Sequence, residues 1–372
     1  MIFRFRYRVG SLRSNAGAVP GDLDDASFPD ATAPAWTGTS DRHEVSKMAR
    51  QNFSVDVARV RSLTDRVREY LLKSVDGQPL PEYAPGAHIA VHTVSPTRGL
   101  IVRHYSLIGG DHQDDDARDT YRIAVQRDSD ARGSAHIHDT FHPGTRLEIG
   151  PPVNNFPLDR RAANVLLIAG GIGITPIFSM ARSLVRRKRP FEVLYAGHDR
   201  EQMAFHDELA TLAGDAAAFH YSDVAGHPDL AALLRRQPEG TQVYVCGPGP
   251  MVQATHAIAK DIGWDASRVR SEMFGVARDK DAHAFDVRLA HSGRIVHVSA
   301  DASILDALNA ANVPVLWDCR RGECGLCPLR VVSSDGPLQH RDFYLSDEEK
   351  AAGDQMCICV SRTAGSEIVL DA

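Results

Sequence analysis

The sequence predicts three successive domains of different class: a β domain, a parallel α/β domain and a C-terminal α+β domain. Three observations support this division. Short strands separated by turns fill residues 49–153 and indicate a barrel. Strands and helices alternate over residues 160–278, which is typical of a parallel sheet. Five of the six cysteines lie beyond residue 318, which indicates a metal-binding module.

The composition is that of a soluble globular protein, with 43% hydrophobic and 24% charged residues in 372. A net charge of −6 gives no reason to expect a nucleic acid or an anionic membrane as a partner. The first residues lack the apolar core of a secretory signal, and no uncharged stretch is long enough to span a bilayer. We therefore expect a cytoplasmic protein. Residues 1–48 show no sustained period and are expected to form a disordered or loosely packed extension.

The C-terminal cysteines have the spacing of an iron–sulfur site. Cys319, Cys324 and Cys327 form a C-x4-C-x2-C run, and Cys357 and Cys359 follow. This is the plant-type spacing for a 2Fe–2S cluster. Structural zinc sites instead show paired C-x2–4-C hooks, and disulfides do not fit a chain without a signal peptide. Cys357 and Cys359 are two positions apart and would share a face of a strand, so the residues alone leave the fourth ligand open.

One strand of the predicted barrel carries Arg103, Tyr105 and Ser106, in the order Arg-x-Tyr-Ser. A flavin site needs a cation for the phosphate, a flat group against the ring or the ribityl chain, and a donor near the flavin N5. These three residues supply all three groups within one short strand. The stretch is compatible with a flavin site, but Arg-x-Tyr-Ser also occurs by chance and does not establish one by itself.

A second motif follows the apolar run of residues 164–169, which is expected to form a parallel strand buried on both faces. The run leads into the segment Gly170-Gly171-Ile172-Gly173-Ile174-Thr175-Pro176. Glycines let the backbone approach a pyrophosphate, and the start of the next helix favours the anion. The pattern differs from the G-x-G-x-x-G fingerprint. A later strand ends at Cys246-Gly247, again before a turn.

Taken together and in this order, the motifs resemble the phthalate dioxygenase reductase family of the ferredoxin reductase-like superfamily. Arg-x-Tyr-Ser resembles its flavin signature, and Gly-Gly-x-Gly-x-Thr-Pro resembles that of its nicotinamide domain. Residues 271–275 resemble its Ser-Glu-x-Phe-Gly segment, and residues 359–362 its Cys-x-Ser-Arg ending. The resemblance implies an antiparallel flavin-binding β-barrel, a parallel α/β nicotinamide domain and a β-grasp 2Fe–2S ferredoxin. The corresponding expected ranges are 49–157, 158–278 and, after a linker at 279–284, 285–372.

The resemblance also implies site residues. FMN would be held by Arg103, His104, Tyr105, Ser106, Gly133 and Ser134, the last two at the start of a short helix. The nicotinamide nucleotide would be held by Gly170, Gly171, Gly173, Thr175, Pro176, Cys246 and Gly247, and Phe274 would pack on the flavin. Ser106, Thr175, Cys246 and Phe274 would be the catalytic group. The cluster ligands would be Cys319, Cys324, Cys327 and Cys359, which leaves Cys357 as a small buried hydrophobe. A purely structural role remains the alternative for Cys246 and Phe274.

The implied function is electron transfer from NADH through FMN and the cluster to a Rieske-type oxygenase. NADH delivers two electrons together and the cluster accepts one at a time, so a flavin must stand between them. FMN is favoured over FAD because this branch of the superfamily binds FMN. His198 stands where many relatives have an arginine, and the nearest arginine is Arg200. NADH is favoured over NADPH because no cluster of arginines for a 2′-phosphate follows.

Two other functions remain open. The same chemistry could serve a haem monooxygenase or a free ferredoxin, or the chain could be a redox sensor or scaffold without turnover. We expect a monomer with neither nucleic-acid nor membrane partners. The oxygenase, its substrate and the oligomeric state are not determined by these motifs.

Overall fold

The structure is a computed structural model that describes residues 52–95, 99–109, 117–127, 133–274, 282–317 and 324–372, together with Arg320 and Gly322. The predicted extension at 1–48, the predicted ligand Cys319 and part of the predicted linker lie outside these residues. The chain from residue 47 onward forms one compact unit. Within the described residues, no helix is both long and apolar enough to cross a membrane.

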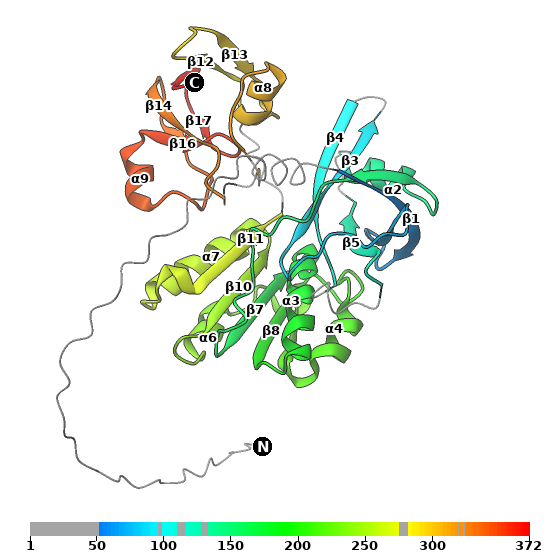
Figure 1. The fold of residues 1–372 in the computed structure, drawn as a ribbon. Coiled ribbons are helices and arrows are strands. Elements are labelled where there is room, and N and C mark those ends of the chain that lie inside the picture. Colours follow the sequence, from blue (N-terminus) through cyan, green and yellow to red (C-terminus); the bar gives the residue numbers. More distant parts are fainter. Residues whose placement is uncertain are drawn as a thin grey trace, which may run out of the picture. The chain divides into compact units, whose positions relative to one another are not determined.

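The first domain is the antiparallel barrel that the sequence predicts. Its six strands run in the order β4-β3-β6-β1-β2-β5, and the two outer strands of that order, β4 and β5, also contact each other (Figure 1). Alternate residues fill the interior, among them Tyr70, Leu72, Ile89, Tyr121 and Ile123. The elements are β1 (Phe53–Ser62), β2 (Val67–Ser74), β3 (His88–Ser95), β4 (Gly99–Ser106), β5 (Thr120–Gln126), α2 (Ser134–Thr140) and β6 (Arg146–Ile149).

The second domain is a parallel five-stranded sheet of order β11-β10-β7-β8-β9. Its strands are β7 (Val165–Gly170), β8 (Phe191–Gly197), β9 (Ala217–Tyr221), β10 (Gln242–Gly247) and β11 (Val269–Met273). Its α-helices are α3 (Ile174–Arg186), α4 (His206–Ala213), α5 (Ser222–Ala225), α6 (Leu230–Arg235) and α7 (Gly249–Asp261). Three short 3-10 turns, η2 (Gly171–Gly173), η3 (Gly214–Ala216) and η4 (Ala266–Arg268), complete the domain.

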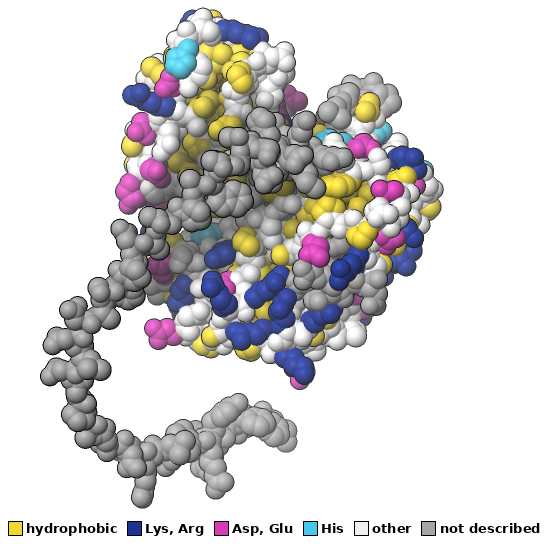
Figure 2. Space-filling view, viewed as in Figure 1, with side chains coloured by type: hydrophobic (Ala, Val, Ile, Leu, Met, Phe, Trp, Pro, Cys, Tyr) yellow, Lys and Arg dark blue, Asp and Glu magenta, His cyan; other side chains and the backbone are white. Residues whose placement is uncertain are grey.

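The central strand β7 is buried on both faces, as its unbroken apolar run predicts. Leu167 and Ala169 belong to one apolar core with residues of α3 and α4, whereas Leu166 and Ile168 belong to another with α6 and α7. Figure 1 shows these helix pairs on opposite sides of the sheet. The basic run 186–189 ends α3 and is largely exposed, and Figure 2 shows Lys and Arg side chains gathered over this domain. Cations at a helix C-terminus match the negative end of its dipole.

The third domain has a mixed five-stranded sheet of order β13-β12-β18-β14-β16, with α8 packed against it. The capping box of Ser303 and Asp306 fixes where α8 begins. The elements are β12 (Phe285–Leu289), β13 (Ile295–Val298), α8 (Ile304–Ala310), β14 (Pro328–Ser334), β15 (Leu338–Gln339), α9 (Asp347–Ala352), β16 (Gln355–Cys357), β17 (Arg362–Thr363) and β18 (Glu367–Leu370). Two strands, a helix and a later return strand, β18, thus follow in the order of a β-grasp domain.

The barrel and the α/β domain share one apolar core. Val67, Ile108 and Phe156 come from the barrel side, and they pack in the same cluster as Phe178 and Phe205 of the α/β domain. Burial of apolar side chains from both domains in one cluster removes their surface from water and stabilises the junction. This junction positions the site described next.

Candidate functional site

Strand β4 ends where the barrel core meets the shared core. Leu107 packs inside the barrel, and Ile108 packs with the α/β domain. Ser106, directly before them, is 4% exposed, and its Oγ has no hydrogen-bond partner in the described part of the chain. Buried hydroxyl groups in folded proteins normally have a partner. Ser106 therefore carries an unused donor at the junction of two domains, which fits a bound flavin.

Arg103 and Gly133 lie together although they are far apart in sequence. A Cβ built on Gly133 would be 2.7 Å from Nε of Arg103, so the absence of a side chain at 133 makes room for the guanidinium. Gly133 directly precedes α2, which has no acidic residue in its first turn. A cation and a helix N-terminus in contact favour an anion such as a phosphate. The pairing that the resemblance implies is thus present in the fold.

The two residues between Arg103 and Ser106 point in different directions. Tyr105 packs against the barrel core, and burial raises the pKa of its phenol. His104, on the opposite face of the strand, packs edge-on against the ring of His88 at 5.3 Å between centroids. The strand therefore does not place His104 on the face that carries Arg103 and Tyr105.

The glycine segment after β7 is held tightly against the end of β10. A Cβ on Gly170 would lie 2.6 Å from Cδ of Pro248, and one on Gly173 would clash with the carbonyl oxygen of Cys246. Gly171 instead has a φ of +54° and faces open space. The loop thus needs glycine for close strand approach at two positions and for a left-handed backbone at the third. Its open side presents bare backbone, as a pyrophosphate site requires.

The remaining predicted nucleotide residues are mostly buried. Thr175 is buried, and its Oγ1 donates a hydrogen bond to the carbonyl oxygen of Ile172 at 3.1 Å, while Pro176 lies in the first turn of α3. Cys246 is fully buried in the shared core, and Phe274 is partly buried against the same core. Gly247 lies close to Gly170, because a Cβ added to Gly247 would be 3.1 Å from the Cα of Gly170. Packing explains the burial of Cys246 and Phe274 as well as a cofactor contact does.

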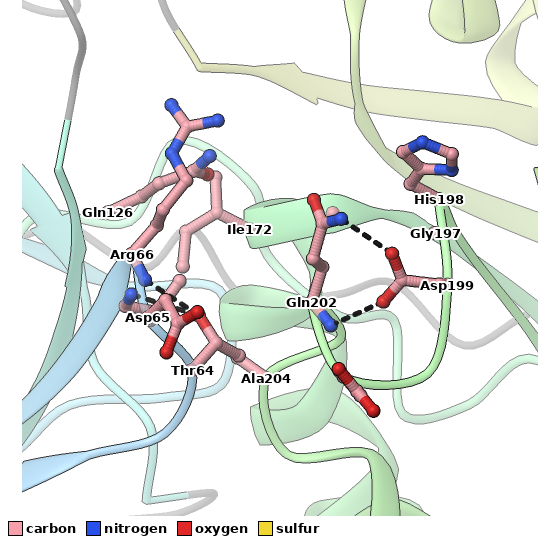
Figure 3. A pocket seen from close by; sticks show the side chains of 13 residues that line it. Thr64, Asp65, Arg66, Gln126, Ile172, Gly197, His198, Asp199, Gln202 and Ala204 are labelled. Atoms are coloured by element: carbon pink, nitrogen blue, oxygen red, sulfur yellow. Dashed lines mark hydrogen bonds between the residues drawn. The ribbon is translucent and has the colours of Figure 1, made fainter.

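A cavity of about 570 Å³ opens beside Gly171, between the barrel and the α/β domain (Figure 3). Its volume is within the range of small-molecule sites. The lining residues are Thr64, Asp65, Arg66, Val67 and Gln126 from the barrel, and Gly171, Ile172, Gly197, His198, Asp199, Glu201, Gln202 and Ala204 from the α/β domain. Sequence reasoning missed the barrel turn entirely, because nothing local to residues 64–67 indicates what they face.

Charges in this cavity bear on nucleotide choice. The Asp199 carboxylate accepts hydrogen bonds from the backbone N of Gln202 at 2.9 Å and from its Nε2 at 2.5 Å. Arg200 does not line the cavity, because its Nη2 pairs with Asp207 at 2.9 Å. Arg66 is the cation on the barrel side, and its guanidinium donates to the carbonyl oxygen of Arg127 at 3.2 Å. A carboxylate, rather than an arginine, thus stands at the end of β8.

Tyr195 is a second residue that sequence reasoning did not single out. It is fully buried in β8, and its single hydroxyl proton is shared between the carbonyl oxygens of Gly171 at 3.2 Å and Ala204 at 3.0 Å. The two carbonyls belong to the two loops that form one wall of the cavity. Burial raises the pKa of the phenol, so it stays a donor at neutral pH.

The cysteine loop of the third domain uses glycine at two left-handed positions. Gly322 has a φ of +75°, and an added Cβ would lie 2.8 Å from Cα of Asp342. Gly325 has a φ of +70° and lies against the ring of Tyr344, where a Cβ would clash. None of the described cysteines is in a disulfide. The described part of the loop therefore has left-handed turns beside the thiols of Cys324 and Cys327.

The two candidates for the fourth ligand are not on the same element. Strand β16 ends at Cys357, and Cys359 lies in the turn that follows, in which the backbone N of Ser361 donates to the carbonyl oxygen of Cys357 at 3.0 Å. The expectation that both lie on one strand is therefore wrong, because the chain turns immediately after Cys357. No three of the described His, Cys, Asp and Glu residues surround a single ion site. A 2Fe–2S cluster takes only two protein ligands per iron.

Two residues that follow Cys359, Ser361 and Arg362, form hydrogen bonds to other parts of the third domain. Ser361 is buried, and its Oγ donates to Asp342 at 3.2 Å. The guanidinium of Arg362 donates to the carbonyl oxygens of Ala302 and His283 and lies over the ring of Phe285 at 4.8 Å. In the Cys-x-Ser-Arg ending, Ser361 and Arg362 thus connect the turn at Cys359 to the rest of the domain through hydrogen bonds and packing.

Comparisons with known proteins agree with this architecture. Residues 146–269 match the family model of the dimethylamine monooxygenase subunit DmmA-like N-terminal domain, and residues 287–364 match the 2Fe-2S iron-sulfur cluster binding domain. The chain is 38% identical over 302 residues to vanillate O-demethylase oxidoreductase from Pseudomonas sp. strain HR199, covering 80% of this chain and 92% of that protein. It is also 38% identical over 322 residues to the heme-dependent oxidative N-demethylase beta subunit of Ectopseudomonas mendocina, covering 86% and 98%.

Among solved structures, phthalate dioxygenase reductase matches with a TM-score of 0.69 and 34% identity, over 86% of this chain and 98% of that one. That protein has a modular structure for electron transfer from pyridine nucleotides to [2Fe-2S]. The barrel, the parallel α/β domain and the C-terminal ferredoxin domain correspond to those modules, so the predicted fold class is confirmed. The chain belongs to the family of oxygenase reductase subunits that includes phthalate dioxygenase reductase, and it is an oxidoreductase that supplies electrons to an oxygenase.

Proposed function

We propose that the protein passes electrons from NADH through FMN and a 2Fe–2S cluster to a Rieske-type oxygenase. FMN would bind in residues 49–157, NADH in residues 158–278 and the cluster in residues 285–372. The observation that carries the proposal is the buried Oγ of Ser106, which has no hydrogen-bond partner among the described residues and lies where the barrel meets the α/β domain. A flavin at this junction would lie beside the nucleotide domain.

The residues present fit the three groups. When bound, the flavin supplies the conversion from paired electrons to single ones. Arg103 and the start of α2 at Gly133–Ser134 would hold its phosphate, Tyr105 would pack beside it, and Ser106 would donate a hydrogen bond to it. The guanidinium of Arg103 and the start of α2 at Gly133 are already in contact, so that part of the site needs no rearrangement of the backbone.

The nucleotide would lie along the open side of the glycine loop. Gly171 leaves backbone open to the pyrophosphate, whereas Gly170 and Gly173 let the loop close against the end of β10. Thr175 and Cys246 would lie beside the nicotinamide. NADH is favoured over NADPH because Asp199 stands in the cavity and Arg200 is paired elsewhere. A carboxylate accepts from a ribose hydroxyl and repels a 2′-phosphate.

We further propose Cys319, Cys324, Cys327 and Cys359 as the cluster ligands. The turn after β16 supports Cys359, because the turn lifts it out of the strand pairing in which Cys357 faces Pro328. Cys357 is fully buried within the apolar core of the domain, as a packing residue is. We also propose a cytoplasmic location, because thiolate ligands persist in a reducing compartment. We propose that the protein is a monomer.

A haem-dependent oxygenase is a second candidate for the acceptor. One relative, 38% identical over nearly its whole length, is the beta subunit of a heme-dependent oxidative N-demethylase. The electron-carrying chemistry of the reductase would be the same in both cases. The choice depends on the surface of the acceptor and not on the sites within this chain.

Reconstitution tests the proposal directly. The protein is loaded anaerobically with FMN, iron and sulfide and then titrated with NADH, and the flavin and cluster absorbances are followed separately. We expect both to bleach with NADH. The loaded protein is then mixed with the oxygenase encoded beside its gene, and in separate reactions with a Rieske-type oxygenase and with a haem-dependent oxygenase. The rates of electron transfer to these acceptors are compared. A colourless protein after loading, or no bleaching with either nucleotide, contradicts the proposed function.

A further inference from the structure

A network of four charged side chains joins the barrel to the α/β domain beside the cavity. Glu69 Oε2 accepts from Arg61 Nη2 at 2.6 Å and from Arg122 Nη2 at 3.0 Å. Glu208, in the first turn of α4, accepts from the same Arg61 nitrogen at 2.5 Å, and its other oxygen lies 3.6 Å from Arg122. Each guanidinium is thus shared between a carboxylate of its own domain and one of the other domain. We call these four residues the interdomain clasp.

The residues of the interdomain clasp lie on the same chain segments as the two walls of the cavity. Arg61 precedes, and Glu69 follows, the turn that contributes Thr64–Val67 to the barrel wall. Ala204 belongs to the opposite wall and leads into α4, which carries Glu208. Beneath the turn, Val67 and Ala204 pack in the shared apolar core. The barrel turn is therefore held from below by packing and from the side by charge.

Charge makes the two halves of the clasp complementary. Glu69 is 1% exposed. Its burial alone would raise its pKa, but Arg122 and Arg61 lower the pKa below its usual value, so the carboxylate is ionised at neutral pH. The barrel half then has two guanidiniums for one carboxylate, and Arg59 adds a third at 3.7 Å. The carboxylate of Glu208, whose side chain is 36% exposed, balances part of this excess positive charge.

We propose that Glu208 is a positioning residue for the nicotinamide nucleotide. Through Arg61 and Arg122 it holds the Thr64–Val67 turn at a fixed spacing from Gly171 and Asp199, and so sets the width of the cavity. The inference rests on the proposed function, in that it takes the cavity as part of the nucleotide path. Glu208 does not line the cavity and acts only through the barrel arginines.

The matched pair of variants is Glu208→Gln and Glu192→Gln. Each change neutralises one partly exposed carboxylate of the α/β domain. Among the described residues, Glu192 pairs within its own domain, with Arg236 and Gln237, and it does not line the cavity. A difference between the two variants therefore isolates the interdomain contact. Glu208→Asp keeps the charge at shorter reach and should give an intermediate result.

The measurement is steady-state NADH oxidation by the loaded protein with ferricyanide as acceptor, at several salt concentrations. For Glu208→Gln we expect KM for NADH to rise about fivefold, the scale of a partly exposed ion pair, with kcat within about twofold of the parent. The parent's KM should rise with salt toward that of the variant, whose own KM changes little. Flavin content and cluster absorbance should match the parent.

Three results would overturn the inference: an unchanged KM in Glu208→Gln, an equal rise in Glu192→Gln, or a parent KM that does not respond to salt. If the parent protein itself does not oxidise NADH, the proposed function fails, and that outcome is seen before any variant is compared.

Discussion

The hydroxyl of Tyr195 donates a hydrogen bond to the carbonyl oxygen of Gly171 across 3.2 Å, and it also reaches Ala204 at 3.0 Å. One buried phenol therefore connects the glycine loop to the loop before α4. Gly171 has a left-handed backbone and no side chain to fix it, so its conformation depends on such external bonds. This relationship makes Tyr195 a support of the predicted nucleotide site.

We expect Tyr195→Phe to raise KM for NADH several-fold, because the glycine loop loses its donor. The cost in unfolding free energy should be about 1 kcal/mol for the lost hydrogen bond, because the carbonyl of Gly171 keeps the backbone N–H of Ile174 as a partner. Tyr244→Phe is the matched control, because its hydroxyl accepts from the backbone N of Asp159 at 2.7 Å, away from the loop. Urea unfolding and NADH kinetics of both variants are the measurements. Equal KM values in the two variants would remove Tyr195 from the site.

The fourth cluster ligand can be tested by two serine substitutions. Cys359→Ser should abolish the visible absorption of the cluster, because Cys359 lies in the turn beside the cysteine loop. Cys357→Ser should retain the cluster but lower stability by about 1–3 kcal/mol, since a hydroxyl replaces a fully buried thiol. Iron content and the visible spectrum are measured after identical anaerobic loading. The reverse pattern would assign the ligand to Cys357.

The contact between Arg103 and Gly133 predicts that a substitution at either residue weakens FMN binding. Arg103→Ala removes the cation, and Gly133→Ala places a Cβ 2.7 Å from Nε and displaces it. Each should weaken FMN binding roughly tenfold to a hundredfold, the scale of a charge-assisted hydrogen bond. Arg146→Ala removes another barrel arginine, paired with Asp56 at the surface, and should bind FMN normally. Fluorescence titration with FMN gives the affinities, and iron content should stay at the parental level in all three.

Glu69 predicts an acid-dependent loss of stability. Its pKa is lowered in the folded protein, so its contribution is fully present above the unfolded value of 4.5 and is lost as the pH falls through the folded value. Glu69→Gln should lower the unfolding free energy by about 3 kcal/mol at neutral pH, because two guanidiniums lose a buried partner. The difference from the parent should shrink below pH 4.5. Urea unfolding from neutral pH to about pH 3.5 tests this, and a pH-independent difference would contradict it.

Much of this fold could be predicted because its signals are local. The apolar run of residues 164–169, the glycines at 170, 171 and 173 and the C-x4-C-x2-C spacing each specify an element or a turn through neighbouring residues. The Arg-x-Tyr-Ser strand and the helix start at Gly133 were also readable locally. The placement of Cys359 was not, because residues two apart share a face only while a strand continues, and here the strand ends at Cys357.

The sequence by itself determined the three domain classes, the flavin and nucleotide motifs and the cysteine set, since each depends on spacing along the chain. Only the tertiary structure decided that the 64–67 turn faces Gly171 and Asp199 across a cavity. It also decided that Glu69 and Glu208 share two arginines. The physical reason is that both arrangements join segments of different domains, and their geometry is fixed by the packing of the shared core rather than by any local pattern.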